Sequence, residues 1–431
     1  MSEEEKFDAI VVGAGPAGSA CAYTLAKEGK EVLLIERGNT PGSKNVTGGR
    51  LYTYALELLD PGIYEEAALE RKVTHEQIMM LGPNRGLNID FHDPSFNQSG
   101  QPPMSYTVLR ANFDEWLAGK AEEKGAVLAC GIKVDELIEE NGKIVGVIAG
   151  EDSIFADVVV AADGVNSFIS QRAGLIKDIN VSTVGVGVKE VIELPAKVIE
   201  ERFNLRNKEE GAARLILGCT EGVHGGGFLY TNRESISLGA VFLPEQVASL
   251  KKSVHELFQD IKLHPSIYPL IEGGGSIEYG AHLVSEAGYR GIPKKLHRDG
   301  FVMIGEAAGF VINTGYSIRG IDLAIVSGIA AARAILNAQT TEQVGTLYMQ
   351  ELNNTNLLPT MKAVDGYFDV LETDWLYDKL PNLANDLFSH LFSVDGSVPN
   401  RLLKDVKNMM NDHELSIWKL MKFGLRGAKS L

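Results

Sequence analysis

A glycine-rich turn near the N-terminus constrains this chain most. Residues 7–29 read FDAIVVGAGPAGSACAYTLAKEG, and the apolar run 9–12 predicts a buried strand. Gly13, Gly15 and Gly18 then form a G-x-G-x-x-G turn into a helix. In such turns the first glycine permits the tight bend, the second lets a pyrophosphate approach the backbone, and the third lets the helix pack on the strand. The helix N-terminus faces the phosphate charge.

An acidic residue after the next strand supports the same interpretation. Residues 31–35 predict a strand that ends in Glu36, about twenty residues beyond the glycines, where a carboxylate accepts hydrogen bonds from the ribose hydroxyls of an adenosine. Together these features predict a dinucleotide-binding fold rather than a fortuitous glycine-rich turn. The loop 37–50 follows, in which Gly48 and Gly49 would let the backbone approach a flat ring; a plain surface loop is the alternative.

Composition excludes several classes of protein. A formal net charge of −16 argues against nucleic acid as a partner. The three cysteines, Cys21, Cys130 and Cys219, are too few for a four-cysteine iron–sulfur or zinc site, so we expect no metal site and predict three buried small residues. The start MSEEEKF lacks a basic segment followed by an apolar core, so we expect a cytoplasmic protein without a secretory signal.

The middle of the chain predicts a second sheet. Residues 127–150 predict a hairpin that turns at Asn141-Gly142, and residues 156–162 predict an apolar strand that returns to the first sheet. Residues 181–243 alternate with a period of two, which is typical of an antiparallel sheet inserted as a substrate domain. The predicted helix 321–337 follows, and its first N–H groups would face the cofactor.

A chain of 431 residues exceeds one ordinary core, so we expect two connected domains and an extension. The predicted architecture is α/β (α+β). It has a discontinuous Rossmann-like cofactor domain at 1–75, 105–178 and 284–340, an antiparallel-sheet substrate domain at 76–104 and 179–283, and a helical region at 341–431.

The end of the chain carries an apolar segment with interspersed cations, residues 415–426, in an otherwise acidic protein. Such a segment suits a membrane interface or a partner protein. A helix that packs on the core is an equal alternative.

Three separated segments carry a resemblance. The glycine turn with Glu36, the pair Asp163-Gly164 after the strand 156–162, and the run 305–309 after a short apolar strand together resemble the glutathione-reductase-type flavoproteins. The resemblance implies an FAD spread from the glycine turn to the helix 321–337. Glu306 departs from the aspartate usual there, and its longer side chain should still reach the ribityl hydroxyls.

A finer resemblance spans nearly the whole chain. The chain is similar to the FixC-type electron transfer flavoprotein–quinone oxidoreductases in residues 42–52, 264–282, 315–324, 392–397 and 422–427. This resemblance implies electron transfer from a reduced FixA/FixB-type electron transfer flavoprotein through FAD to a membrane quinone. An iron–sulfur cluster would be carried by a separate ferredoxin-like FixX-type subunit, with the chain peripheral on the inner face of the cell membrane.

The resemblance also implies site residues. Arg110 and Asp163 would serve the phosphates and, with Glu306, the ribityl chain. Judged on its residues alone, the position of Arg110 favours a surface ion pair over a phosphate contact. His282 and Tyr316 are candidates for quinone contact, and no catalytic residue is assigned. The predicted FAD-binding residues are Gly13, Gly15, Ala17, Gly18, Glu36, Arg37, Lys44, Asn45, Gly48, Gly49, Arg110, Val134, Asp163, Gly164, Gly305, Glu306, Gly315, Gly320, Ile321 and Asp322.

Three alternative functions stay open at this point. A prenyl-lipid (geranylgeranyl-type) double-bond reductase is similar in the glycine turn and in the Gly48-Gly49 loop. An NADPH-dependent flavin hydroxylase is compatible with Asp163-Gly164. A flavin-bearing scaffold subunit without a substrate of its own is the third.

Overall fold

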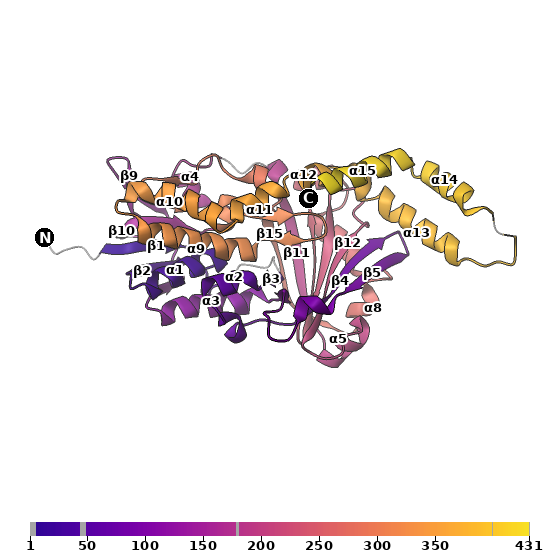
Figure 1. The fold of residues 1–431 in the computed structure, drawn as a ribbon, viewed down its shortest axis with the longest axis horizontal. Coiled ribbons are helices and arrows are strands. Elements are labelled where there is room, and N and C mark those ends of the chain that lie inside the picture. Colours follow the sequence, from indigo (N-terminus) through magenta and orange to yellow (C-terminus); the bar gives the residue numbers. More distant parts are fainter. Residues whose placement is uncertain (1–5, 44–48, 178–180, 399, 431) are drawn as a thin grey trace.

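The computed structural model describes residues 6–43, 49–177, 181–398 and 400–430. Figure 1 shows an elongated molecule with one sheet and its helices at the N-terminal end, a second sheet in the middle, and the helices of residues 379–392 and 402–412 at the far end. The chain passes several times from one sheet to the other, so neither sheet is formed by one continuous stretch of sequence.

The first sheet forms the centre of the N-terminal half, with strand order β16-β17-β10-β1-β2-β7. The pairs within β17-β10-β1-β2-β7 are parallel, as expected for strands buried on both faces, whereas β16 pairs antiparallel at the edge. Its strands are β1 (Lys6–Val12), β2 (Val32–Glu36), β7 (Val127–Cys130), β10 (Asp152–Ala161), β16 (His297–Arg298) and β17 (Phe301–Met303).

Three helices pack together beside this sheet: α1 (Pro16–Lys27), α3 (Arg110–Glu123) and α9 (Ile321–Asn337). α1 and α9 approach closely, since a Cβ on Gly328 would lie 2.2 Å from the carbonyl oxygen of Ala17. The helices α10 (Thr341–Asn354) and α11 (Leu357–Ala363) extend the same core through Tyr348 and Met361. The predicted helix 321–337 is therefore observed with the bounds expected.

A hairpin lies beside β10 and confirms the turn predicted at Asn141-Gly142. Its strands β8 (Glu136–Glu140) and β9 (Lys143–Ala149) pair Glu140 with Lys143. Asn141 and Gly142 both have positive φ, 50° and 86°, as a type I′ turn requires.

The second sheet has the order β15-β11-β14-β13-β12-β4-β6-β3, with β5 on β4. It is antiparallel except for the pair β12–β4, which is parallel, so the expectation of a purely antiparallel sheet needs this correction. Its strands are β3 (Arg50–Tyr52), β4 (Lys72–Leu81), β5 (Gly86–His92), β6 (Ser105–Thr107), β11 (Val184–Glu193), β12 (Glu210–Leu217), β13 (Gly225–Thr231), β14 (Ser235–Phe242) and β15 (Gly275–Ser285).

Helices cover one face of the second sheet. α5 (Ala196–Phe203) and α7 (Val254–Lys262) contribute Phe203 and Phe258 to a separate apolar core under β11, β12 and β14. The remaining short elements are α2 (Tyr54–Leu59), α4 (Phe168–Arg172), α6 (Pro244–Val247), α8 (Tyr268–Ile271) and the ribbon of β18 (Ile312–Asn313) and β19 (Ile318–Arg319).

The strands place two predicted domain limits inside continuous elements. The limit between residues 75 and 76 falls within β4, and the limit between 283 and 284 falls within β15. β3 and β6, assigned to the cofactor domain, hydrogen-bond within the second sheet. Sequence alternation did not reveal these short strands because each has only three residues.

Four α-helices complete the part of the chain that the structure describes. They are α12 (Gly366–Leu371), α13 (Lys379–Phe392), α14 (Leu402–Asp412) and α15 (Ile417–Lys429). α13 lies against β4 and β5, and α15 lies against α12 (Figure 1). Among the helices that the structure describes, none has the length and apolar character needed to cross a membrane.

Candidate functional site

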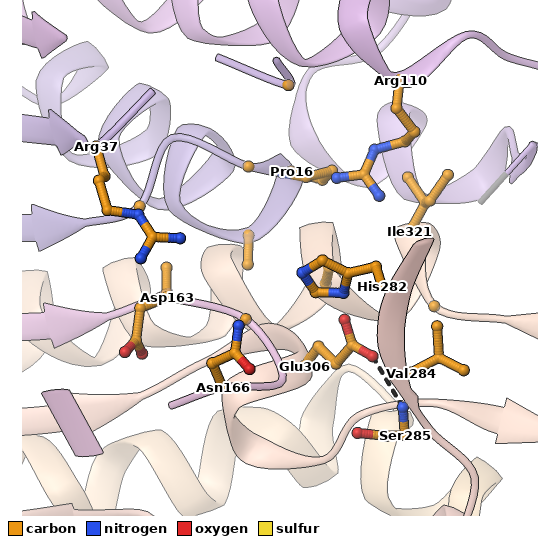
Figure 2. Close-up of a pocket in the computed structure, with 18 of the residues that line it drawn as sticks. Pro16, Arg37, Arg110, Asp163, Asn166, His282, Val284, Ser285, Glu306 and Ile321 are labelled. Carbon is orange, nitrogen blue, oxygen red and sulfur yellow. Dashed lines mark hydrogen bonds between the residues drawn. The ribbon is translucent and has the colours of Figure 1, made fainter. Parts of the chain in front are cut away.

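A cavity of about 830 Å³ lies where the carboxyl ends of the parallel strands meet the second sheet. Such a position, outside the carboxyl ends of parallel strands, is the usual ligand site of open α/β sheets. The glycine turn, Glu36 and α9 line one part of the cavity, and β13, β14 and β15 line the other. Figure 2 shows side chains from both sheets pointing into the same space.

The glycine turn has the close contacts that the motif requires. A Cβ on Gly13, where φ is +109°, would lie 2.4 Å from the carbonyl oxygen of Ala162, and a Cβ on Gly18 would lie 1.9 Å from that of Gly13. Gly15 is the N-cap of α1, and no side chain of the residues that the structure describes caps that helix end. The N-terminus of α1 therefore opens into the cavity with its dipole available to an anionic group.

Glu36 ties the end of β2 to this turn. Its Oε2 accepts the backbone N–H of Ala14 at 3.1 Å, and its Oε1 accepts that of Gly38 at 2.6 Å. Each carboxylate oxygen has a second lone pair, so the fixed carboxylate can still accept from two ribose hydroxyls. This geometry fits the adenosine end of a dinucleotide.

Arg110 reaches the cavity from the first turn of α3. Its guanidinium donates from Nε and Nη2 to the two oxygens of Asp114, at 2.8 and 2.7 Å. Asp114 is fully buried, so this bidentate pair fixes the orientation of the Arg110 guanidinium. Figure 2 shows Arg110 beside Pro16 and Ile321. The interpretation of Arg110 as part of a surface ion pair was therefore wrong, because its ion pair with Asp114 is buried and the side chain lines the cavity.

Two carboxyl groups of half-buried residues also line the cavity. Asp163 Oδ2 accepts the backbone N–H of Ile169, whereas its buried Oδ1 has no partner among the described residues. Burial raises the pKa of Asp163 to about 6 although backbone donors lower it. Glu306 Oε1 accepts the N–H of Ser285 at 3.0 Å, and burial likewise raises its pKa (Figure 2). Both acids are placed to bind hydroxyl donors.

Apart from Asp322 and Tyr316, the predicted site residues separate into four groups. Those lining the cavity are Gly13, Gly15, Ala17, Glu36, Arg37, Gly49, Arg110, Val134, Asp163, Gly164, His282, Glu306, Gly320 and Ile321. Gly18 and Gly305 lie in the packing behind it, and Gly315 lines a smaller cavity. Lys44, Asn45 and Gly48 lie outside the residues that the structure describes.

Two predicted side chains point elsewhere. Asp322 is buried and pairs with Arg319 and Tyr54, so only its backbone can serve a ligand at the start of α9. Tyr316 is 46% exposed and packs edge-on against Tyr367 rather than lining the large cavity. His282 does line it, and its Nδ1 donates to the carbonyl of Leu283.

Several cavity residues were not anticipated from the sequence. Phe228, Tyr230 and Val241 line the cavity from β13 and β14, and Tyr230 contacts the position where a Cβ of Gly49 would lie, at 2.5 Å. Glu286 follows β15 directly and also lines the cavity. The alternation of the strands could have identified the aromatic residues as facing one side together.

No group of three or more potential metal ligands occurs within the ranges that the structure describes. The cysteines are free: Cys21 is buried, as expected, whereas Cys130 and Cys219 are half-buried.

Comparison with known proteins agrees with this site. A model of the FAD binding domain matches residues 6–205, and a model of the ETF-QO/FixC family C-terminal domain matches residues 368–431. The Protein FixC of Salmonella typhi is 43% identical over 433 residues, covering 99% of this chain and all of that protein. The "Probable electron transfer flavoprotein-quinone oxidoreductase YdiS" of Escherichia coli K12 is 41% identical over 437 residues, again covering 99% of this chain and all of that protein.

A solved structure shares the fold at low identity. The geranylgeranyl bacteriochlorophyll reductase-like protein of Thermoplasma acidophilum superimposes with a TM-score of 0.71 at 20% identity, covering 95% of this chain and 99% of that one. This likeness concerns the fold.

The glycine turn, the fixed Glu36, the orphaned Asp163 oxygen and the FAD-domain match together define an FAD-dependent oxidoreductase. The full-length relatives are more specific. The chain belongs to the FixC family of electron transfer flavoprotein–quinone oxidoreductases.

Proposed function

We propose that this chain takes electrons from a reduced FixA/FixB-type electron transfer flavoprotein and passes them through FAD to a membrane quinone. The observation that carries the proposal is the relative named as an electron transfer flavoprotein-quinone oxidoreductase, which matches 99% of this chain. Bound FAD supplies the ability to exchange electrons singly with one partner and in pairs with another.

The chain's own residues position and polarise the site. The α1 N-terminus and Arg110 would hold the phosphates of FAD, and Glu36 would hold the adenosine ribose. Glu306 and Asp163 would accept from hydroxyl groups of the cofactor. The N-terminus of α9, which has no side-chain cap, stabilises negative charge on a ring placed against Gly320 and Ile321.

The electron route requires a partner for any iron–sulfur cluster, because the chain has three cysteines and a cysteine-ligated cluster needs four. We assign the cluster to a separate ferredoxin-like subunit of the FixX type. Electrons from the electron transfer flavoprotein would pass through this iron–sulfur cluster and through the FAD before they reach the quinone.

α15 supplies the peripheral contact with the membrane. Its outer side presents Trp418, Met421 and Leu425, which are 76%, 50% and 60% exposed. Phe423 packs against Trp375 with the two rings tilted, and Arg426 donates to the carbonyl of Asp369, so the opposite side of the helix is docked on the protein. An apolar strip flanked by lysines suits an anionic lipid interface.

The test is anaerobic reduction of the purified holoprotein, with and without the ferredoxin-like subunit. Reduced electron transfer flavoprotein, NADH and NADPH are offered in turn, followed by a short-chain quinone. We expect only the flavoprotein to bleach the flavin absorbance and the quinone to restore it. Rapid bleaching by NADPH alone would indicate a self-sufficient reductase or hydroxylase, and reduction without any reoxidation by quinone would indicate a scaffold subunit.

A further inference from the structure

A second cavity of about 110 Å³ adjoins the large one. Four residues line both cavities: Phe228, Val241, Glu286 and Ile318. Within the described part of the chain, Glu286 is the one ionisable side chain that lines both. A titratable group at such a junction can exchange protons with either space.

Neighbouring residues fix the Glu286 carboxyl. The backbone N–H of Glu286 donates to the carbonyl of Thr183 at 2.9 Å, and the Oε2 atom of its side chain accepts from Asn313 Nδ2 at 2.8 Å. The side-chain amide of Asn313 cannot rotate by 180° without losing a hydrogen bond, because its Oδ1 accepts the N–H of Gly315 at 2.8 Å. Oε2 is therefore an acceptor, and a proton on this carboxyl resides on Oε1.

The surroundings favour the neutral acid. Burial raises the pKa of Glu286 to about 7, the bond from Asn313 opposes this shift, and the nearby carboxyl of Glu306 adds to it. The other titratable groups at the smaller cavity are His224, Glu372 and Tyr377. The carboxyl thus holds a proton and releases it close to neutral pH, which suits a general acid.

The smaller cavity connects Glu286 with the surface. His224 lines it, and its Nε2 lies 2.8 Å from Asp374 Oδ1, whose side chain is 92% exposed. The imidazole stacks on the ring of Tyr377, another lining residue, with ring centroids 4.8 Å apart. A space of this size holds roughly three water molecules at about 30 Å³ each, and His224 and Glu286 both line it.

We propose that Glu286 is the proton donor for the acceptor reduced in the large cavity and that it is reprotonated from solvent through the smaller cavity, past the His224–Asp374 pair. This inference rests on the proposed function. A quinone takes up two electrons and two protons to become a quinol. One proton comes from the Glu286 carboxyl, and the electron pair and the other proton come from the reduced cofactor, whose electrons the electron transfer flavoprotein supplied.

The first test compares Glu286→Gln with the wild-type holoprotein in single-turnover reoxidation. Gln keeps an oxygen for Asn313 but cannot donate the acidic proton. With a short-chain quinone we expect wild-type rates to fall as pH rises through about 7, and E286Q to be about 100-fold slower at pH 6 and independent of pH. With ferricenium, which takes electrons without protons, the two proteins should react equally fast.

The matched control is Glu245→Gln, an exposed carboxyl in the first turn of α6 that lines neither cavity. It should keep the wild-type rate and pH profile. His224→Ala tests the route separately: the first turnover should be unchanged, and repeated turnovers should slow at least tenfold because reprotonation becomes limiting.

A readout independent of turnover is the infrared carboxyl band. The wild type should show a protonated carboxyl that titrates near pH 7 and is lost in E286Q. Equal quinone rates in E286Q and wild type, or no such band, would overturn this inference and leave the proposed function standing. Failure of the wild type to react with any quinone would overturn the proposed function itself.

Discussion

The carboxylate of Glu36 accepts the backbone N–H of Ala14, so the acid at the end of β2 is joined directly to the glycine turn after β1. The two residues lie 22 positions apart in the sequence, and the parallel pairing of β1 with β2 brings them together. The turn and the ribose-binding acid therefore form one rigid unit before any ligand arrives.

Replacing this acid should weaken FAD binding. Glu36→Ala removes two acceptors of backbone N–H groups together with the ribose acceptor, so we expect the Kd for FAD to rise about 100-fold, or about 3 kcal/mol. Titration of apoprotein with FAD, followed by flavin fluorescence, measures the effect. Glu28→Ala, an exposed acid at the end of α1, serves as control and should bind as the wild type does.

The packing of α1 on β1 should depend on the absence of a side chain at Gly18. In Gly18→Ala the new Cβ would lie 1.9 Å from the carbonyl oxygen of Gly13, so we expect loss of about 3 kcal/mol of unfolding free energy. Gly119→Ala is the matched helical control, because among the described residues no atom outside the backbone of its own helix and its two chain neighbours lies within 4 Å of its Cβ position. It should stabilise by up to about 1 kcal/mol, and equal denaturation midpoints for both variants would contradict the close contact.

A buried lysine offers a pH-dependent test of stability. Lys189 is fully buried in β11, its Nζ has no partner among the described residues, and burial lowers its pKa from 10.5 to about 8. The unfolded chain keeps this proton up to about pH 10.5, so the folded state is penalised below pH 8 and gains stability as pH rises from 8 to 10.5.

Lys189→Met should therefore raise the free energy of unfolding at pH 7 by on the order of 2–3 kcal/mol, with a smaller gain at pH 10. Denaturant titrations at both pH values measure this. Lys262→Met is the control, because that ammonium is paired with Glu190 at 2.8 Å and its loss should destabilise. If Lys189→Met lowers the free energy of unfolding, as Lys262→Met should, the Lys189 ammonium makes a stabilising interaction in the folded protein.

The outer side of α15 should govern lipid binding. Replacing both Trp418 and Leu425 with Glu adds charge to the exposed apolar strip, so co-sedimentation with anionic liposomes should fall at least tenfold while FAD stays bound. Gly424→Ala and Gly427→Ala, two open positions on the same helix, should leave sedimentation unchanged. Unaltered binding of the double variant would remove α15 as the lipid contact.

The sequence predicted the parts of the fold that depend on local pattern. The glycine turn, the hairpin turn at Asn141-Gly142 and the helix 321–337 are each specified by neighbouring residues, and the structure confirms these elements. Short strands such as β3 and β6 escaped prediction because three residues carry too little alternation.

The sequence predicts the site residues that belong to motifs. It does not predict the residues that reach the cavity through the register of distant strands. Glu36 ends a strand beside the glycine turn, so its approach to the cavity could be anticipated, whereas the role of Arg110 was implied only by the family resemblance. Phe228 and Glu286 reach the cavity only because β13 and β15 are assembled at particular registers with β14 and β11. Register between distant strands depends on tertiary packing, which a single sequence does not display.

The reaction of the reduced holoprotein with quinone tests the central claim most directly. The protein is reduced photochemically without any protein donor and mixed anaerobically with a short-chain quinone, with a geranylgeranylated lipid or with oxygen and an aromatic substrate. Recovery of the flavin absorbance with formation of one quinol per FAD, and no product from the other acceptors, is the predicted result. Stoichiometric saturation of the prenyl lipid or hydroxylation of the aromatic substrate, with the quinone left unreduced, would contradict the proposed electron route.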